Sequence, residues 1–549
     1  MTFQKSLISL VIATAATTLV GCDDDENSVN NPDIGGGQVL IYTTSGEFLD
    51  AANVGHLPDM VKFSDDHTLV VANEGEPEDD YVADDEGSIS IITLNSNNTV
   101  QDVTTLGFSE DMLQGNVRIK PDSNAAQDLE PEYVAVNAAG DTAWVTLQEN
   151  NAVAIVDLNK KEIQSVKALG AVTVADQEMD ISDDGNANPV MNNPANIFAL
   201  YMPDTIQSYS VNGQDFYVTA NEGDDREYGD YEDLEKAKDL NLSAELQAAL
   251  DDTDMKKLRV LTDLGKNEQG VYEALYMTGT RSFTIWNSAG EAVFDSASDF
   301  EEELAANFAA TFNTRVDDVD YVDANDAEYE ESDFFKDIVD KGMVADQDYE
   351  VIGDKVYYWE GVDARSLKKG AEPEALALHQ IGAKTFAYIG LEKQGGFFVY
   401  DVTSPENAEM IEYVNHIEYD KKPSEAGDLA PEGMVAFTQD SQHYLAVAHE
   451  LSSTLALFEL AQDGTATAIT SVALGSFDEG AAEIVDYSAA DKKLFVTNAE
   501  TQMVDVIDVA DPSNASKVSS IDFSEYADDL QSVSVKNGLL AIAVKRKDD

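Results

Sequence analysis

The stretch LQSVSVKNGLLAIAVK, residues 530–545, reads as two short strands that have no further partners downstream. Near the other end of the chain, QVLIYTTSGEFLDAANV, residues 38–54, reads as two more strands with none before them. Both stretches are rich in the β-branched and apolar residues that are typical of strands. Joined together, the two pairs would make one four-stranded unit.

Between these ends the chain repeats a unit of about 40 to 50 residues, the period of repeat architectures. Each unit has a first strand that opens with Pro and an acid or a similar pair, a second strand followed by Glu, and two further strands. The predicted second and third strands of the six complete units span residues 68–73 and 88–94, 143–148 and 152–158, 216–221 and 282–286, 386–391 and 396–402, 444–449 and 454–460, and 494–499 and 504–509.

Six complete units and one divided unit predict an all-β chain, a seven-bladed β-propeller over residues 38–549 that strands from both termini close. Closure of this kind removes the open sheet edges on which other chains would pair. A β-sandwich or several separate β domains are the alternatives, and neither accounts for a half unit at each end.

Acids recur at two places in the repeat, and propeller geometry would put both sets around one mouth of the central channel. The first strands carry Asp59, Glu132, Asp204, Glu374, Glu432 and Glu483, with Gln531 in the seventh place. The second strands are followed by Glu74, Glu149, Glu222, Glu392, Glu450 and Glu500, with Lys545 in the seventh place.

Converging carboxylates repel each other, so their pKa values rise unless a cation lies among them. Oxygen ligands favour Ca²⁺ or Mg²⁺ over zinc, and no organic cofactor is predicted. The alternative is that each acid caps backbone amides at the start of its strand. The predicted metal ligands are Asp59, Glu74, Glu132, Asp204, Glu222, Glu374, Glu432 and Glu483.

Two acidic insertions, 223–277 and 296–372, interrupt the repeat in and after the third unit, where they lie on loops of the same predicted face. A helical stretch is predicted over 233–251 in the first of them. Long loops on a rigid scaffold often carry function, although disorder is an equal alternative for 314–350. Asp180 and Asp184, in DISDDG (180–185), are two further predicted metal ligands, because they have the spacing of a calcium loop. Position 12 of that loop is Met191 rather than Glu, so the loop is not a complete EF-hand loop.

Catalytic patterns are few, because the chain has six His and no G-x-S-x-G motif. Arg226 and His449 are the candidate catalytic residues, His449 because it stands beside Glu450 at the predicted mouth. Arg226, Arg281, Arg365 and Lys393 are scarce cations that either bind an anionic group such as phosphate or neutralise carboxylates.

The composition and the first residues predict an exported protein. Its 106 acidic and 33 basic residues give a formal charge of −73, which argues against nucleic acid as a partner. Residues 1–21 read as a signal peptide, and LVGC (19–22) resembles a lipobox that would place lipid on Cys22, the single cysteine. Residues 22–37 form an acidic, Gly-rich tether. An ordinary secretory signal with an incidental cysteine is the alternative.

The repeat motifs resemble the choice-of-anchor I family of bacterial surface proteins. The matching segments are LPDM (57–60), ANEGEP (72–77), YMPD (201–204), TANEGD (219–224), RSFTIW (281–286), EPE (372–374) and APEG (430–433). The resemblance implies a propeller with variable attachment, here a lipid anchor in the bacterial envelope, at the inner or the outer membrane. Two departures stand out: the segment 480–538 resembles the usual start of the domain, and 296–372 is longer and more acidic than expected.

Together these observations predict a lipid-anchored, monomeric propeller that binds divalent cations and a small-molecule or protein partner at its acidic face. Some relatives carry alkaline-phosphatase-like names. A metal-dependent phosphoesterase that uses the same face, with Arg226 holding phosphate, is therefore the alternative function.

Overall fold

A computed structural model describes residues 36–77, 84–189, 193–229, 231–251, 253–320 and 349–546. The chain divides into the units Met1–Ile34 and Gly35–Asp549, and the fold below belongs to the second unit. The predicted signal peptide, Cys22 and the tether up to residue 35 lie outside the described residues. None of the helices described has the length and apolar character that crossing a membrane requires.

The described residues form an all-β fold, as predicted, and seven of its sheets have four or five strands. Six of these sheets each contain consecutive strands of one repeat. Their strands are β3 (Pro58–Phe63), β4 (Thr68–Asn73), β5 (Ser88–Leu94) and β6 (Val100–Gly107); β8 (Val134–Val136), β9 (Thr142–Leu147), β10 (Ala152–Asp157) and β11 (Glu162–Ala168), with β7 (Leu113–Gln114) parallel to β11; β14 (Ile206–Val211), β15 (Gln214–Asn221), β21 (Ser282–Asn287) and β22 (Ala292–Asp295); β26 (Pro373–Ile381), β27 (Lys384–Leu391), β28 (Phe397–Asp401) and β29 (Glu409–Val414); β30 (Pro431–Gln439), β31 (Gln442–His449), β32 (Thr454–Leu460) and β33 (Ala466–Ala473); and β34 (Val485–Ser488), β35 (Lys493–Asn498), β36 (Met503–Asp508) and β37 (Ser516–Asp522).

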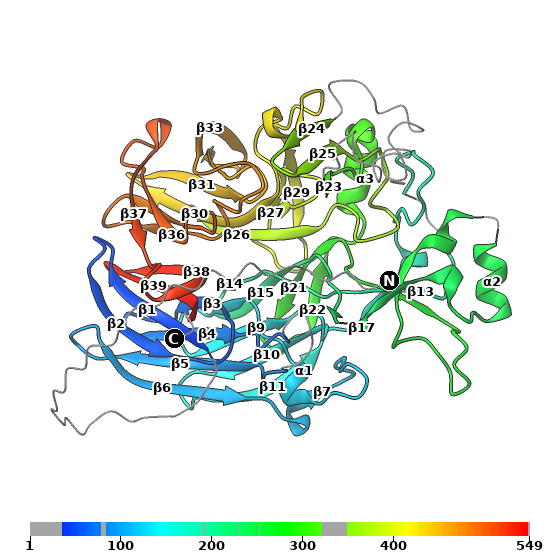
Figure 1. Cartoon of the computed structure of the whole chain (residues 1–549), viewed down its shortest axis with the longest axis horizontal. Helices are drawn as coiled ribbons and strands as arrows, with labels where there is room; N and C mark the ends of the chain where they lie inside the picture. The colour runs from blue at the N-terminus through cyan, green and yellow to red at the C-terminus, as the bar shows by residue number, and fades with distance from the viewer. Residues whose placement is uncertain are drawn as a thin grey trace, which may run out of the picture. The chain divides into compact units, whose positions relative to one another are not determined.

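The seventh sheet joins the two ends of the repeat region. Its order is β2 (Phe48–Asn53), β1 (Gly37–Thr43), β39 (Leu539–Arg546) and β38 (Ala527–Lys536). Figure 1 shows β1 and β2 in blue beside β38 and β39 in red. β1 and β39 pair antiparallel along their lengths, from Gly37 opposite Lys545 to Thr43 opposite Leu539. The two sequence stretches that lack partners of their own therefore complete each other.

Apolar clusters lie between sheets that follow one another in the sequence. Val70 of β4 packs in one cluster with Val145 of β9, and Leu445 of β31 packs in another with Tyr388 of β27. The terminal sheet takes part in two such clusters, because Ile41 lies with Val71 and Leu40 lies with Phe495. Both faces of the middle strands are thereby covered, which explains why β4, β9 and β10 read as continuous apolar runs rather than alternating patterns.

The two insertions fold into small elements rather than long helices. The loop between β15 and β21 contains β16 (Glu227–Tyr228) paired with β17 (Tyr231–Glu232), β18 (Leu234–Lys236) paired with β19 (Arg259–Leu261), and α2 (Ala244–Leu250). Its last strand, β20 (Leu275–Met277), pairs with β13 (Ile197–Leu200), which also pairs with β12 (Ala171–Thr173). The loop between β22 and β26 contains α3 (Asp299–Asn307) and the sheet of β23 (Val316–Asp320), β25 (Lys355–Trp359) and β24 (Tyr349–Ile352). A further short helix, α1 (Ala125–Asp128), precedes β8.

A helix was expected over 233–251. Within this segment only α2 (Ala244–Leu250) is an α-helix. Residues Leu234–Lys236 are a strand instead, because they pair with Arg259–Leu261 across the insertion. Ser243 begins α2 by accepting a hydrogen bond from the Leu246 amide, an ordinary N-cap. Tertiary pairing has overridden the helical pattern of the first half of this segment.

Truncation of Ile542 on β39 should weaken the sheet that joins the two ends. Its side chain is fully buried, so Ile542→Ala is expected to lower the free energy of unfolding by about 2–5 kcal/mol. Val518→Ala is the control, because Val518 is 52% exposed on β37 and its loss should cost about 0.5 kcal/mol or less. Urea melts of the two variants measure the difference. Equal losses in the free energy of unfolding would contradict the expected contribution of Ile542 to the terminal sheet.

Candidate functional site

One backbone arrangement recurs where the repeats enter their first strands. The residue just before the strand-opening proline has a positive φ in four units, at Leu57 (45°), Met202 (44°), Glu372 (57°) and Ala430 (60°). Non-glycine residues occupy this region sparsely, so its recurrence is a built feature of the repeat. In the three units of Leu57, Glu372 and Ala430, the carbonyl of that residue accepts a hydrogen bond from the amide of the Glu that follows the second strand, at 2.8–2.9 Å.

This bond explains why two sets of acids keep the same register. The amides of Glu74, Glu392 and Glu450 are the donors, so each of these residues is tied to the entrance of its own first strand. In the third unit the bond shifts by one residue, since the Gly223 amide donates to Met202. The acid after the proline and the Glu after the second strand are therefore brought together by backbone bonds.

The repeated acids line two adjoining cavities that share Asp59 and Asp204. The first, here called the acidic cavity, measures about 320 Å³ and is also lined by Glu432, Glu450 and Glu483. The second, here called the mixed cavity, measures about 490 Å³. It is lined by Glu74, Glu132, Glu222, Glu372, Glu374, Glu392 and Asp224, together with Arg315, Arg365, Lys369 and Lys393. All eight acids predicted from the repeat line one cavity or the other.

Burial and mutual repulsion raise the pKa values of these carboxyl groups. Burial is the main cause at Asp59, with Asp204 and Glu76 nearby, and its pKa rises to about 7. The same cause raises the pKa of Asp204 to about 6 and that of Glu222 to about 8. Burial also raises the pKa values of further members well above their ordinary range, namely Glu74, Glu132, Glu374 and Glu432.

Capping of backbone amides does not account for most of these acids. Among the described residues, no backbone amide donates to the carboxylates of Asp59, Glu132, Glu374 or Glu432, whereas Glu500 accepts from the Ser476 amide at 3.0 Å. Glu132 is only 8% exposed, and its Oε2 is buried without a hydrogen-bond partner. A buried carboxylate oxygen in this state is costly unless a ligand satisfies it.

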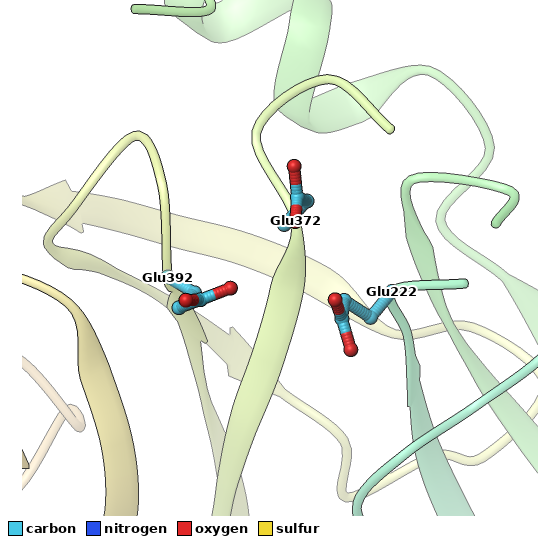
Figure 2. A group of neighbouring side chains, drawn as sticks. All are labelled: Glu222, Glu372 and Glu392. Atoms are coloured by element: carbon cyan, nitrogen blue, oxygen red, sulfur yellow. The ribbon is translucent and has the colours of Figure 1, made fainter. Parts of the chain in front are cut away.

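A tighter group within the mixed cavity consists of Glu222, Glu372 and Glu392, which offer oxygens within 4.8 Å of one another. Figure 2 shows Glu222 and Glu392 pointing toward each other from two sides, with Glu372 between them. Lysines already approach this group: Lys369 Nζ lies 2.6 Å from Glu222 Oε1 and 3.4 Å from Glu372 Oε2. Burial opposes ionisation of Glu372, but Lys369 and Arg365 overcome it and lower its pKa to about 2.

Glu372 was not among the predicted ligands. Its place before Pro373 is a weak signal in the sequence, because Glu130 also precedes Pro131, whereas Leu57, Met202 and Ala430 stand before the prolines of three other units. Glu392 belonged to the second predicted set of acids, although not to the predicted ligands. The salt bridges of Arg365 with Glu372 and of Lys393 with Glu392 show these two cations neutralising acids.

Arg226 lies in a buried charge network and lines neither cavity. It is 1% exposed and forms salt bridges with Asp128 at 3.2 Å, Glu130 at 3.6 Å and Asp233 at 3.6 Å. Its amide also donates to Asp233 at 3.1 Å. The guanidinium therefore neutralises carboxylates, the second of the two roles considered for it from the sequence.

The remaining candidates also lie apart from the two cavities. His449 ends β31, is 4% exposed and has a pKa that burial lowers, so it is a buried neutral imidazole. Asp180 accepts hydrogen bonds from Ser182 and from the Asn188 amide, and Asp184 accepts from Asn186. These two carboxylates therefore accept hydrogen bonds from residues of their own loop.

Comparison with known proteins now adds the family. A model of the choice-of-anchor I domain matches residues 9–342 and 349–405. The chain belongs to the choice-of-anchor I family. This confirms the resemblance seen in the repeat motifs, although the APEG segment at 430–433 lies beyond the matched residues. Membership indicates a protein of the cell surface.

Individual relatives are distant. The chain is 26% identical over 149 residues to Gigasin-3a of Magallana gigas and spans 40% of that protein's length. Among solved structures it is similar to the periplasmic gluconolactonase PpgL of Pseudomonas aeruginosa, with 11% identity and a TM-score of 0.41 over 88% of this chain and 96% of that one. It is also similar to the Cps50 (Swd1) β-propeller domain of Myceliophteria thermophila, with 8% identity and a TM-score of 0.37 over 92% of this chain and 99% of that one.

The raised pKa values predict a stability that falls as the pH rises in chelator. Between the unfolded values of about 4 and the folded values of about 6 to 8, the folded state binds more protons than the unfolded state, so the free energy of unfolding decreases with pH. Thermal melts between about pH 5 and about pH 8 measure this slope. Asp59→Asn should flatten it, whereas Asp440→Asn, whose side chain is 74% exposed, should leave it unchanged. If the free energy of unfolding falls with pH equally steeply in both variants, Asp59 does not cause the slope.

Proposed function

We propose that this choice-of-anchor I protein is a seven-bladed, lipid-anchored β-propeller that binds a divalent cation in its acidic cavity. Ca²⁺ is the proposed ion, and the same face is proposed to receive a small-molecule or protein partner. The supporting observation is the convergence of carboxylates from six units of the repeat on two adjoining cavities.

The proposal of a closed ring is supported by the order of the apolar clusters. Each pair of consecutive four- or five-stranded sheets shares a cluster, and the terminal sheet shares one with the β3 sheet and one with the β34 sheet. The first strands follow the same order, since β38 contacts both β3 and β34. Seven sheets in a cyclic series need no edge-to-edge partner, which is how propellers avoid aggregation through their strands.

The acidic cavity has the stronger excess of negative charge of the two cavities and is therefore the better candidate for a cation site. Its lining within the described residues includes five carboxylates and no Lys or Arg, whereas four cations line the mixed cavity. The amide of Gln531 and the hydroxyl of Tyr133 add neutral oxygens to the acidic cavity. Ca²⁺ takes six to eight oxygen ligands in variable geometry, while Mg²⁺ demands a compact octahedron. A wide cavity lined by oxygens therefore favours Ca²⁺.

The phosphoesterase alternative loses the residues proposed for it from the sequence. Arg226 is held by three carboxylates, and His449 is buried away from both cavities. Cation binding uses residues that do meet, so it is the function that the geometry supports best.

Calcium should stabilise the purified protein. At a free Ca²⁺ concentration of about 100 times the dissociation constant, binding adds about 2.7 kcal/mol to the free energy of unfolding, visible as a higher melting temperature than in EDTA. Glu432→Gln and Glu483→Gln remove two carboxylates of the acidic cavity and should each weaken binding by about tenfold. Glu409→Gln, an exposed position on β29, is the control. The proposal fails if EDTA leaves the melting temperature unchanged and no metal co-purifies.

The anchor is tested separately by Cys22→Ser. The variant should move from the membrane fraction to the soluble fraction, because the lipid chains that hold the mature protein can no longer be attached. Mass spectrometry of the mature N-terminus supplies a second measurement. A wild-type N-terminus without lipid mass would overturn the proposed attachment.

A further inference from the structure

A third cavity, of about 200 Å³, has the opposite charge. It is lined by Arg259, Arg315, Arg365, Lys368 and Lys369, with Asp225 as the one acid in its described lining. The whole chain has 33 basic residues against 106 acidic ones. Five of the 33 at one small cavity is a strong local reversal of charge, and we call it the cationic cavity.

The two insertions build the cationic cavity between them. The first supplies Arg259 on β19, and the second supplies Arg315 before β23 and Arg365, Lys368 and Lys369 before β26. Backbone and side-chain bonds tie the insertions together at this point. The Arg259 amide donates to the Leu367 carbonyl at 3.1 Å. Loops that are joined in this way hold their charged side chains in fixed positions.

Arg281 fixes the segment that carries three of the five cations. Its guanidinium donates to the carbonyl of Ser366 at 2.7 Å and to that of Lys368 at 3.0 Å. A salt bridge to Glu301 at 2.6 Å neutralises it, and it is 2% exposed. Arg281 therefore has a structural role, and the neighbouring cations are the ones that line the cavity.

Two cations of the cavity are not neutralised by salt bridges. Within the described part of the chain, neither Arg259 nor Lys368 has a carboxylate oxygen within 4.0 Å, although acids outnumber bases threefold overall. Arg365 is 4% exposed, and its Nε is buried with no hydrogen-bond partner. Arg226, by contrast, contacts three carboxylates. The cationic cavity therefore holds donors and positive charge that the chain itself does not use.

We infer that the cationic cavity binds a small oxyanion with more than one negative charge, such as a phosphoryl group. Guanidinium groups present paired N–H donors that match the oxygens of phosphate, and an ammonium adds a compact charge. A doubly charged anion balances unpaired cations better than a carboxylate does. Repulsion between the cations agrees with this assignment, because burial and then Arg365 lower the pKa of Lys368.

The anion site lies next to the acids described above. Arg315, Arg365 and Lys369 line both the cationic cavity and the mixed cavity. A ligand with a phosphoryl group in the cationic cavity would therefore border the carboxylates of the mixed cavity. The inference goes beyond the proposed cation binding and does not require it, because none of its residues lines the acidic cavity.

Calorimetric titration with inorganic phosphate tests this site, first in chelator and then with Ca²⁺ kept below the level that precipitates calcium phosphate. The double variant Arg259→Gln, Lys368→Gln should bind phosphate at least about tenfold more weakly in whichever condition the wild type binds it. Lys384→Gln is the matched control, because Lys384 is a 53% exposed lysine on β27. Neither substituted side chain of the double variant forms a salt bridge, so its melting temperature should match that of the wild type.

The outcomes separate this inference from the proposed cation binding. Phosphate binding that is absent in both conditions, or unchanged in the double variant, overturns it. Acetate that binds as tightly as phosphate overturns the preference for a doubly charged ligand, while sulfate that binds like phosphate supports it. Ca²⁺ titration of the double variant without phosphate should match the wild type, so failure of one site is distinguishable from failure of the other.

Discussion

The antiparallel pairing of β1 with β39 is the contact on which the arrangement of the sheets depends. Without it, residues 38–54 and 530–545 would each be a two-stranded piece, and such pieces are marginally stable in water. With it, both form one sheet whose apolar faces contact the sheets on either side in sequence. The one cysteine of the chain stands at position 22, so no disulfide can form within the described fold. The fold therefore relies on the burial of apolar side chains.

The convergence of the acids on the acidic and mixed cavities follows from backbone hydrogen bonds rather than from any attraction between the carboxylates. In the units of Leu57, Glu372 and Ala430, hydrogen bonds between the start of the first strand and the end of the second place acids beside one another. At this place burial, together with the neighbouring acids, raises the pKa values of Asp59 and Glu374. Packing within the sheets overrides a repulsion that these residues would avoid if they were free to move apart, which is typical of sites where ligands supply the missing charge.

Much of this was predictable from the sequence, because the repeat fixes both strand positions and acid positions. Predicted strands at 68–73 and 454–460 coincide with β4 and β32. The eight repeated acids line the two adjoining cavities, as the register required. The insertions were harder to predict, since they have no repeat to set their pairings: Leu234–Lys236 became a strand through a partner over 20 residues away in sequence. For the same reason the convergence of Arg259 with Lys368 carried no signal in the sequence.

Lys369 occupies a position with consequences for both kinds of charge. It contacts Glu222, Asp224 and Glu372, and it also borders the cationic cavity. It acts as a built-in counter-ion for these carboxylates of the mixed cavity, so a cation that displaced it from them would free its ammonium for the anion that we infer in the cationic cavity. Any such exchange makes the two sites thermodynamically linked, and linkage is reciprocal: whatever one ligand gains from the presence of the other, the other gains equally. If both of the proposed ligands bind beside it, this one side chain would couple the response of a very acidic protein to a cation with its response to an anion.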